Sequence, residues 1–214
     1  MPGRSDKGSR RPDHSGQPEN HRFLEVLSQA VEALEQDGLE YLLMGGVSSA
    51  TLGRPRFTHD IDLFIRPEDA TAALEALAHA GFDPERTDPR WLYKAFKDKV
   101  MVDLIFRSAG DIYLDAEMLE HASVEEVGGR LTRVIAPEDL VLIKAVVAAE
   151  HTPRHWYDAL GLIARCELDW DYLVKRARRH GIRRVLSLLV YAQSDDLGVP
   201  PSAIQELYQS LFQA

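Results

Sequence analysis

The chain has 214 residues, enough for one large domain or two small ones with a sizeable core. A net charge of −9 and a pI near 5.4 exclude a surface coated with basic residues for indiscriminate polyanion binding. The single cysteine, Cys166, excludes an internal disulfide framework and a multi-cysteine zinc site, so a reducing cytoplasm is the expected location.

Residues 1–20 are predicted to form a disordered tail, because they are polar and lack the apolar core of a secretory signal. No apolar run farther along approaches the ~20 residues that cross a bilayer. The best candidate, LVLIKAVVAA, carries Lys144 in its middle. We therefore expect no membrane partner.

Residues 21–136 combine helical and strand patterns. Apolar residues recur at helical spacing from His21 to Gly38, which predicts a helix. EYLLMGG predicts a buried strand feeding a turn, VSSATLG a short helix, DIDLFI a strand, and PEDATAALEALAHAGF a helix. WLYKAFKDKVMVDLIFR predicts two strands with a tight turn near residues 97–99, and VEEVGG with RLTRVIA a further hairpin.

Residues 137–214 read as helical throughout. The segments PEDLVLIKAVVAAE, HWYDALGLIARC, WDYLVKRARRHG, IRRVLSLLVYAQ and SAIQELYQSLF are separated by Pro, Gly or acidic caps. The predicted fold class is therefore α+β: an N-terminal mixed sheet with flanking helices over residues 21–136, then a C-terminal helical bundle over residues 137–214. The boundary is expected near Ala136–Pro137.

Two acids interrupt the apolar strand DIDLFI. Asp60 and Asp62 alternate with apolar residues, so they project from the same strand face, roughly 6 to 7 Å apart along the strand. Carboxylates held so close repel one another unless a cation lies between them, and Mg²⁺ prefers such oxygen ligands. Asp103, in VMVDLIFR, lies in another apolar strand. The alternatives are a solvated strand face for the pair and, for Asp103, an exposed position on an edge strand or a salt bridge.

A glycine pair, Gly45–Gly46, follows the first predicted strand. Glycines there allow close approach of the backbone to a ligand, and the following helix start presents free amide groups to an anion. Ser48 adds a hydroxyl donor. The alternative is a tight turn without a ligand. The pattern is neither GxxxxGK[ST] nor GxGxxG.

Together these residues resemble the signature of the nucleotidyltransferase superfamily, which is DNA polymerase beta-like. In MGGVSSATLGRPRFTHDIDLFI a Gly-Gly pair precedes a spacer and Asp-x-Asp, and a third Asp follows on a later strand. The resemblance implies a nucleotidyltransferase fold for residues 21–136 and a catalytic triad that binds Mg²⁺ or Mn²⁺. It implies metal binding by Asp60, Asp62 and Asp103, and binding of a nucleoside triphosphate (NTP) by Gly45, Gly46, Ser48, Arg56 and Thr58.

The helical half resembles the bacterial AbiEii and MenT-like nucleotidyltransferase toxins. Their pattern, a PEDL…K helix followed by a helix with RxxxD, is matched by Pro137, Glu138, Asp139, Leu140, Lys144, Arg154 and Asp158. The resemblance implies that Lys144 neutralises triphosphate charge, that Asp158 orients it, and that an antitoxin is a partner. His155-Trp156-Tyr157 replaces the lysine-containing stretch that usually precedes the aspartate. The alternatives for Lys144 are a structural ion pair with Asp158 and a snorkelling surface lysine.

A basic stretch, VKRARRHGIRR, follows in the helical half. It is either a solvated helical face or a contact for RNA phosphates, which gives the RNA-binding candidates Arg176, Arg178, Arg179, Arg183 and Arg184. Trp91 is expected to be a core or interface residue, and His155 an ordinary polar residue.

The predicted function is a magnesium-dependent nucleotidyltransferase that moves NMP from an NTP to an acceptor hydroxyl. The expected acceptor is a tRNA 3′ end, in a toxin–antitoxin setting. Two alternatives remain open. One is transfer to a small molecule such as an antibiotic, or to a protein side chain. The other is a non-catalytic nucleotide-binding module.

Overall fold

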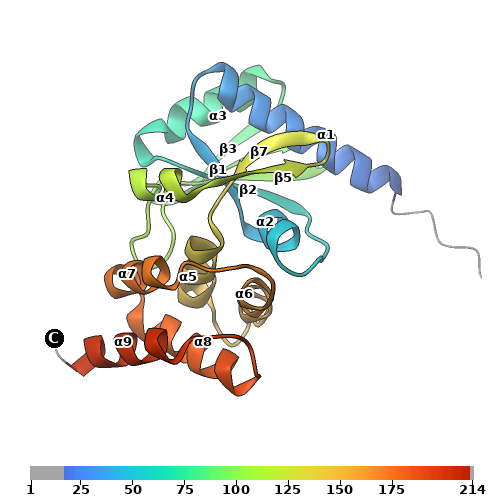
Figure 1. Cartoon of the computed structure of the whole chain (residues 1–214). Helices are drawn as coiled ribbons and strands as arrows, with labels where there is room; N and C mark the ends of the chain where they lie inside the picture. Colours follow the sequence, from blue (N-terminus) through green and yellow to red (C-terminus); the bar gives the residue numbers. More distant parts are fainter. Residues whose placement is uncertain (1–16, 213–214) are drawn as a thin grey trace, which may run out of the picture.

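A computed structural model describes residues 17–212 (Figure 1). It contains one mixed sheet with the strand order β3-β4-β5-β2-β1-β7-β6. The strands are β1 Tyr41–Met44, β2 Asp60–Ile65, β3 Asp83–Asp88, β4 Leu92–Lys97, β5 Val100–Ile105, β6 Ser123–Val127 and β7 Arg130–Val134. The helices are α1 Gln17–Gln36, α2 Gly45–Leu52, α3 Ala70–His79, α4 Ala116–His121, α5 Pro137–Val147, α6 Arg154–Arg165, α7 Trp170–His180, α8 Ile182–Ser194 and α9 Pro201–Phe212, with a 3₁₀ turn at Pro67–Asp69.

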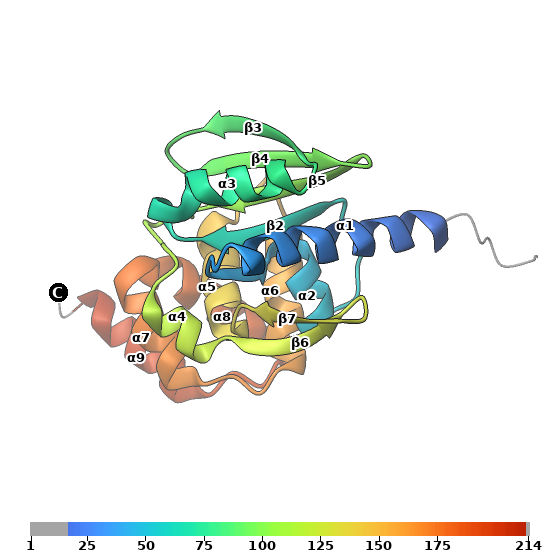
Figure 2. The same ribbon diagram turned by 90° about the horizontal axis from the view of Figure 1, so that it is seen from above.

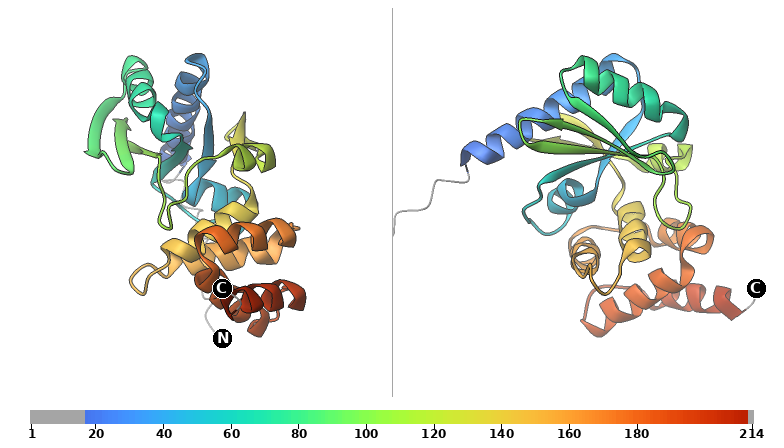
Figure 3. Two further views of the ribbon diagram at one scale, coloured as in Figure 1. Left: turned by 90° about the vertical axis from the view of Figure 1, so that its left-hand side faces the viewer. Right: turned by 180° about the vertical axis from the view of Figure 1, so that it is seen from behind.

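The two faces of the sheet are covered by different parts of the chain. Helices α1 and α3 lie over one face (Figure 2), where they form a core with residues such as Leu43, Ile61 and Leu63. Helix α2 and the C-terminal helices lie on the opposite side (Figure 3), and the core there includes Leu42 and Phe64. Successive strand residues thus enter opposite cores, as strand geometry requires. The C-terminal helices share a core with the sheet.

The predicted fold class, a mixed sheet with flanking helices followed by a helical region, is confirmed. Two boundaries differ. Helix α1 begins at Gln17, so residues 17–20 are helical and not part of a tail, while residues 1–16 lie outside the described residues. Gly45 and Gly46 form the first turn of α2 instead of a separate turn before it. Between Gln17 and Phe212, no helix is long and apolar enough to cross a membrane.

Two elements, β3 and α4, were not predicted. Strand β3 has the sequence DPERTD and lies exposed at the edge of the sheet, so it lacks the apolar alternation that marks a strand. Helix α4 has only 6 residues. It begins after Asp115, whose side chain accepts a hydrogen bond of 2.9 Å from the Met118 amide. Such short or edge elements depend on tertiary contacts.

The central strands β2 and β5 are parallel and pair Asp62 with Asp103. Strands β4 and β5 form a hairpin around Asp98 and Lys99, which both have positive φ values, of 50° and 67°. This two-residue turn sets the register that places Lys94 opposite Asp103. The acids of two separate strands and one lysine therefore meet on one face of the sheet.

The helical region is tied to the sheet region through a buried arginine. Arg176, on α7, is fully buried and donates from Nε to Asp139 of α5 at 2.9 Å and from Nη1 to Asp115 at 2.6 Å. Asp139 also accepts a 2.7 Å hydrogen bond from the Tyr172 hydroxyl. Arg176 therefore joins α5, α7 and the start of α4. This corrects the expectation that Arg176 contacts RNA.

Replacing this arginine tests its structural role. We expect Arg176→Met to lower the free energy of unfolding by about 3 to 5 kcal/mol, because it leaves the buried Asp139 carboxylate without its cation. Urea denaturation measures the change. The matched control is Arg178→Met, in the same helix but exposed, which should cost less than about 1 kcal/mol. Equal effects of the two substitutions would contradict this role.

Candidate active site

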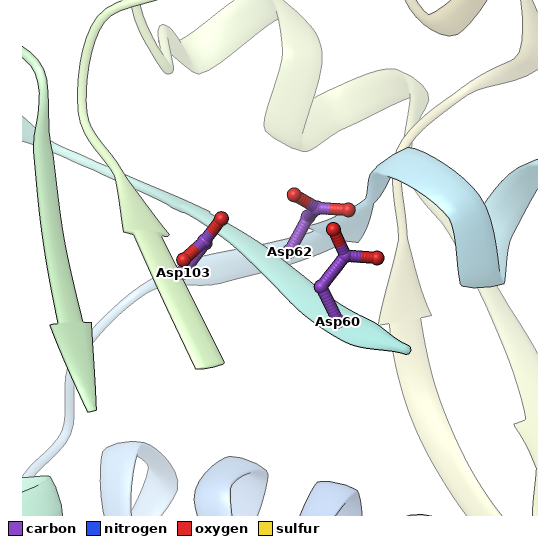
Figure 4. Close-up of side chains that lie close together, drawn as sticks. All are labelled: Asp60, Asp62 and Asp103. Carbon is purple, nitrogen blue, oxygen red and sulfur yellow. The ribbon is translucent and has the colours of Figure 1, made fainter. Parts of the chain in front are cut away.

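Three carboxylates converge at the centre of the sheet (Figure 4). Asp60 and Asp62 come from β2, and Asp103 comes from β5. One oxygen from each residue lies within 4.8 Å of the others. The structure therefore brings together the three acids that the sequence predicted as metal ligands.

Among residues 17–212, each carboxylate has one hydrogen-bond donor. Thr58 Oγ1 donates to Asp60 at 2.5 Å, the Gly46 amide donates to Asp62 at 3.3 Å, and Lys94 Nζ donates to Asp103 at 2.7 Å. Carboxylate oxygens accept up to two hydrogen bonds each, so most of the acceptor capacity of the cluster is left over.

The electrostatics of the cluster favour an added cation. Burial, followed by the charges of Asp60 and Asp103, raises the pKa of Asp62 to about 7. Burial also raises the pKa of Asp103, although Lys94 opposes this effect. The cost of three clustered acids falls when a hard divalent cation binds them, and a set of oxygen ligands alone suits Mg²⁺ or Mn²⁺. The residues present therefore fit such an ion.

The two glycines make room for this cluster. Gly45 has φ +68°, and a Cβ there would lie 1.8 Å from Asp62 Oδ2. A Cβ at Gly46 would lie 2.4 Å from Thr58 Oγ1. Only glycine at both positions allows the start of α2 to pack against β2 with these side chains in place. The α2 N-terminus, which attracts anions, thus lies beside the acids.

Ser48 has a different place from the one predicted. Its side chain is fully buried, and its hydroxyl donates to the Leu43 carbonyl at 2.8 Å. It is not among the residues that line the cavity described below. Ser48 anchors α2 to β1, and the expectation that it faces a triphosphate is corrected.

A buried ion-pair network connects the helical region to the site. Lys144 of α5 donates to Asp158 Oδ2 at 2.9 Å. Arg56 donates to both oxygens of the same carboxylate, from Nε at 2.8 Å and from Nη2 at 2.9 Å. Burial raises the pKa of Asp158, but the two cations outweigh it and hold the pKa below its usual value. Asp158 thus holds the side chains of Lys144 and Arg56 in position.

The acids, the glycines and the cations open into one cavity of about 610 Å³. Lys144 and Arg56 line it, whereas Asp158 does not. The other lining residues are Met44, Gly45, Gly46, Thr58, Asp60, Asp62, Arg90, Trp91, Asp103, Ile105, Arg107, Ser108, Ala109, Gly110, Asp111, Ile143, Val147, Arg154 and His155. The cavity therefore lies between the sheet and helices α5 and α6.

Several residues that line this cavity or contact its acids were not predicted as site residues. Lys94 was missed although the hairpin turn at Asp98–Lys99 indicates its register with Asp103. Trp91, expected in the core or an interface, is 42% exposed and faces the cavity. Burial, then the charges of Lys144 and Arg154, lowers the pKa of His155 to about 4, so its imidazole is neutral at pH 7. No sequence pattern indicates these last two placements, because they depend on tertiary packing.

The remaining predicted RNA contacts lie outside the cavity, around the junction of α7 and α8. Arg178 and Arg179 pair with Glu206 and Glu117. Arg183 and Arg184 are exposed and, within residues 17–212, form no ion pair or side-chain hydrogen bond through their guanidinium groups. These two are thus the arginines of the stretch that are free to contact an external anion.

Comparison with known proteins shows the family to which the chain belongs. Residues 17–194 match the model of a family described as an uncharacterised nucleotidyltransferase. The match spans more than half of the chain, so the protein belongs to this nucleotidyltransferase family and is an enzyme of the nucleotidyltransferase type. No curated protein matches the sequence.

Solved structures share the fold at low identity. The antibiotic-resistance factor ANT(2″)-Ia is 16% identical, with a TM-score of 0.54 over 82% of this chain and 94% of that chain. Its complex with adenylyl-2″-tobramycin is 17% identical, with a TM-score of 0.52 over 80% and 97%. An antigenic nucleotidyltransferase-like protein from Paracoccidioides brasiliensis is 15% identical, with a TM-score of 0.50 over 87% and 93%. At identities this low, the structural similarity shows a common fold and no more.

A pair of glycine substitutions tests the packing of α2 against the acids. Gly38 and Gly45 have nearly the same φ, +67° and +68°, but a Cβ at Gly38 meets nothing within 4 Å. Gly38→Ala should therefore cost only the backbone strain, roughly 1 to 2 kcal/mol. Gly45→Ala adds a collision with Asp62, so it should cost more in urea denaturation and should also weaken Mn²⁺ binding measured by electron paramagnetic resonance. Equal stability and equal Mn²⁺ affinity of the two variants would contradict this packing.

Proposed function

We propose that the protein transfers NMP from an NTP to an acceptor hydroxyl in a reaction that depends on Mg²⁺ or Mn²⁺. One observation carries the proposal: the three carboxylates, the N-terminus of α2 and Lys144 meet in a single cavity. Such a cavity offers ligands for metal and groups for phosphate at neighbouring positions. The acceptor oxygen bonds to the α-phosphorus, and the bond to the pyrophosphate oxygen breaks.

In this proposal the three acids do not all have the same role. Asp60, Asp62 and Asp103 hold the metal, and Asp103 also accepts the proton of the acceptor hydroxyl. Bound divalent cations supply electrophilic stabilisation of the phosphate oxygens during the displacement. Lys94 donates to Asp103, so it orients this carboxylate and opposes the rise in its pKa that burial causes.

The phosphates of the NTP are assigned to the groups around the N-terminus of α2 and Lys144. Gly45 and Gly46 at the α2 N-terminus and the cations Lys144 and Arg56 all line the cavity, and they are the groups proposed to bind these phosphates. Asp158 is assigned as a positioning residue, because its carboxylate binds both cations and does not line the cavity. Thr58 orients Asp60 through its hydroxyl.

The charges of the cavity favour an anionic acceptor. Apart from the three metal-binding acids, the lining contains one acid, Asp111, and it pairs with Arg107. The other cationic lining residues are Arg56, Arg90, Lys144 and Arg154. A polycationic antibiotic would find few partners here, whereas the end of an RNA chain carries the complementary charge. We therefore propose an RNA 3′ end, such as that of tRNA, with Arg183 and Arg184 as outer phosphate contacts.

This acceptor corresponds to the toxin-like interpretation, in which the enzyme modifies tRNA and an antitoxin protein restrains it. The resemblance of α5 and α6 to AbiEii and MenT-like toxins supports this interpretation through Lys144 and Asp158. The likeness in fold to ANT(2″)-Ia keeps transfer to a small molecule as the competing outcome of the acceptor test.

Loss of a single carboxylate tests the reaction. We expect Asp60→Asn to reduce transfer from α-³²P-labelled NTPs by at least about 10²-fold, because an essential charge of the metal site is lost. Incubation with total RNA, a protein mixture and an antibiotic panel identifies the acceptor, and RNA should carry the label. Asp83→Asn, on exposed β3, is the control. Full activity of Asp60→Asn would contradict the reaction, and label on antibiotics would contradict the acceptor.

A double-mutant cycle tests the positioning role of Asp158. We expect Lys144→Ala and Asp158→Ala each to lower kcat/KM for the NTP by about 10²-fold, since both misplace a phosphate-binding cation. Because Asp158 acts partly through Lys144, Asp158→Ala should have a much smaller effect in the Lys144→Ala background. Fully additive losses with unchanged stability would contradict coupling between the two residues.

A further inference from the structure

The cavity has a second, apolar end that the proposed reaction does not use. Strand β5 passes from Asp103 to Ile105, whose side chain is on the same face two residues on. Leu92 pairs with Ile105, so Trp91, immediately before β4, lies at the far end of the same cavity. Trp91 therefore lies beside the end of β5, three residues or ~10 Å along the sheet from Asp103.

The backbone of Trp91 is held by hydrogen bonds, and its side chain is open to the cavity. Its amide donates to the Asp88 carbonyl at 3.2 Å, and its carbonyl accepts from the Phe106 amide at 3.0 Å. These bonds tie it to the ends of β3 and β5. A large apolar side chain that is 42% exposed at a fixed position in a cavity wall offers a binding surface of low conformational cost.

The surroundings of Trp91 combine apolar contact with positive charge. Ile105, Ile143 and Val147 line the cavity with it. Arg90 and Arg107 flank this wall, and each is held by one acid, Asp88 and Asp111 respectively. A ligand that fits this end has a flat, largely apolar ring system and carries negative charge. A nucleobase attached to phosphate has this chemistry, because every base presents a π-face for stacking.

We propose that Trp91 is the stacking platform of a nucleobase subsite at this end of the cavity. The proposal rests on the proposed function, since a nucleobase is a ligand only if the site takes nucleotides. The base has two sources: the NTP itself or the terminal nucleotide of the acceptor RNA. Both bring a ring to Trp91 and phosphates to the neighbouring cations.

Binding measurements without turnover test the subsite and separate the two sources. The probes are each of the four NTPs with Mg²⁺, and a single-stranded RNA oligonucleotide with a 3′-deoxy terminus. Affinities are compared for the wild type, Trp91→Ala, Trp91→Phe and the control Tyr208→Ala, an exposed aromatic residue on α9. Quenching of tryptophan fluorescence by each probe gives a direct signal of stacking, and Trp91→Phe removes the contribution of Trp91.

We expect Trp91→Ala to weaken one of the two probes by about 5- to 150-fold, and Trp91→Phe to restore most of that affinity. Weaker NTP binding identifies the base of the NTP, and weaker RNA binding identifies that of the acceptor. Unchanged affinity for both probes in Trp91→Ala would overturn the subsite alone. If the wild type bound neither probe, the proposed function would be overturned together with it.

Discussion

The parallel pairing of β2 with β5 is the constraint on which the site depends. It places Asp62 opposite Asp103, while alternation along β2 brings Asp60 to the same face. A shift of one residue in this register would turn Asp103 toward the core beneath α1 and α3 and destroy the cluster. The apolar residues that alternate with the acids, Ile61 and Leu63, hold the register by packing in that core. The hydrophobic pattern of these strands therefore also determines where the charges meet.

The second constraint is the packing of the C-terminal helices on the face that carries the acids. Lys144 of α5 and Arg56 of the loop before β2 converge on Asp158 of α6, so one buried carboxylate joins three parts of the chain. Removing one partner from such a network leaves an uncompensated buried charge, which is costly. The same network keeps two cations beside the carboxylate cluster. Stability and the electrostatics of the cavity thus depend on the same residues.

Much of this arrangement follows from local patterns. The period-two acids in DIDLFI and the turn at Asp98–Lys99 are enough to predict the strands, and the turn also indicates Lys94 opposite Asp103. Other features depend on contacts between distant segments. Arg176 belongs to a basic stretch but is buried against Asp139, 37 residues away. Trp91 resembles a core residue in sequence, and only the path of the β5–α4 loop and α5 leaves it facing a cavity. Side chains that meet through tertiary packing leave no signal at any fixed spacing.

The central claim is that the three carboxylates form a metal site for a nucleotide. Anomalous diffraction from crystals grown with Mn²⁺ and a non-reactive NTP analogue tests it most directly. The account predicts Mn²⁺ peaks bound by Asp60, Asp62 and Asp103, with the triphosphate against the α2 N-terminus and Lys144. Nucleotide bound elsewhere, or clear nucleotide density in this cavity with no metal at the three acids, would contradict it.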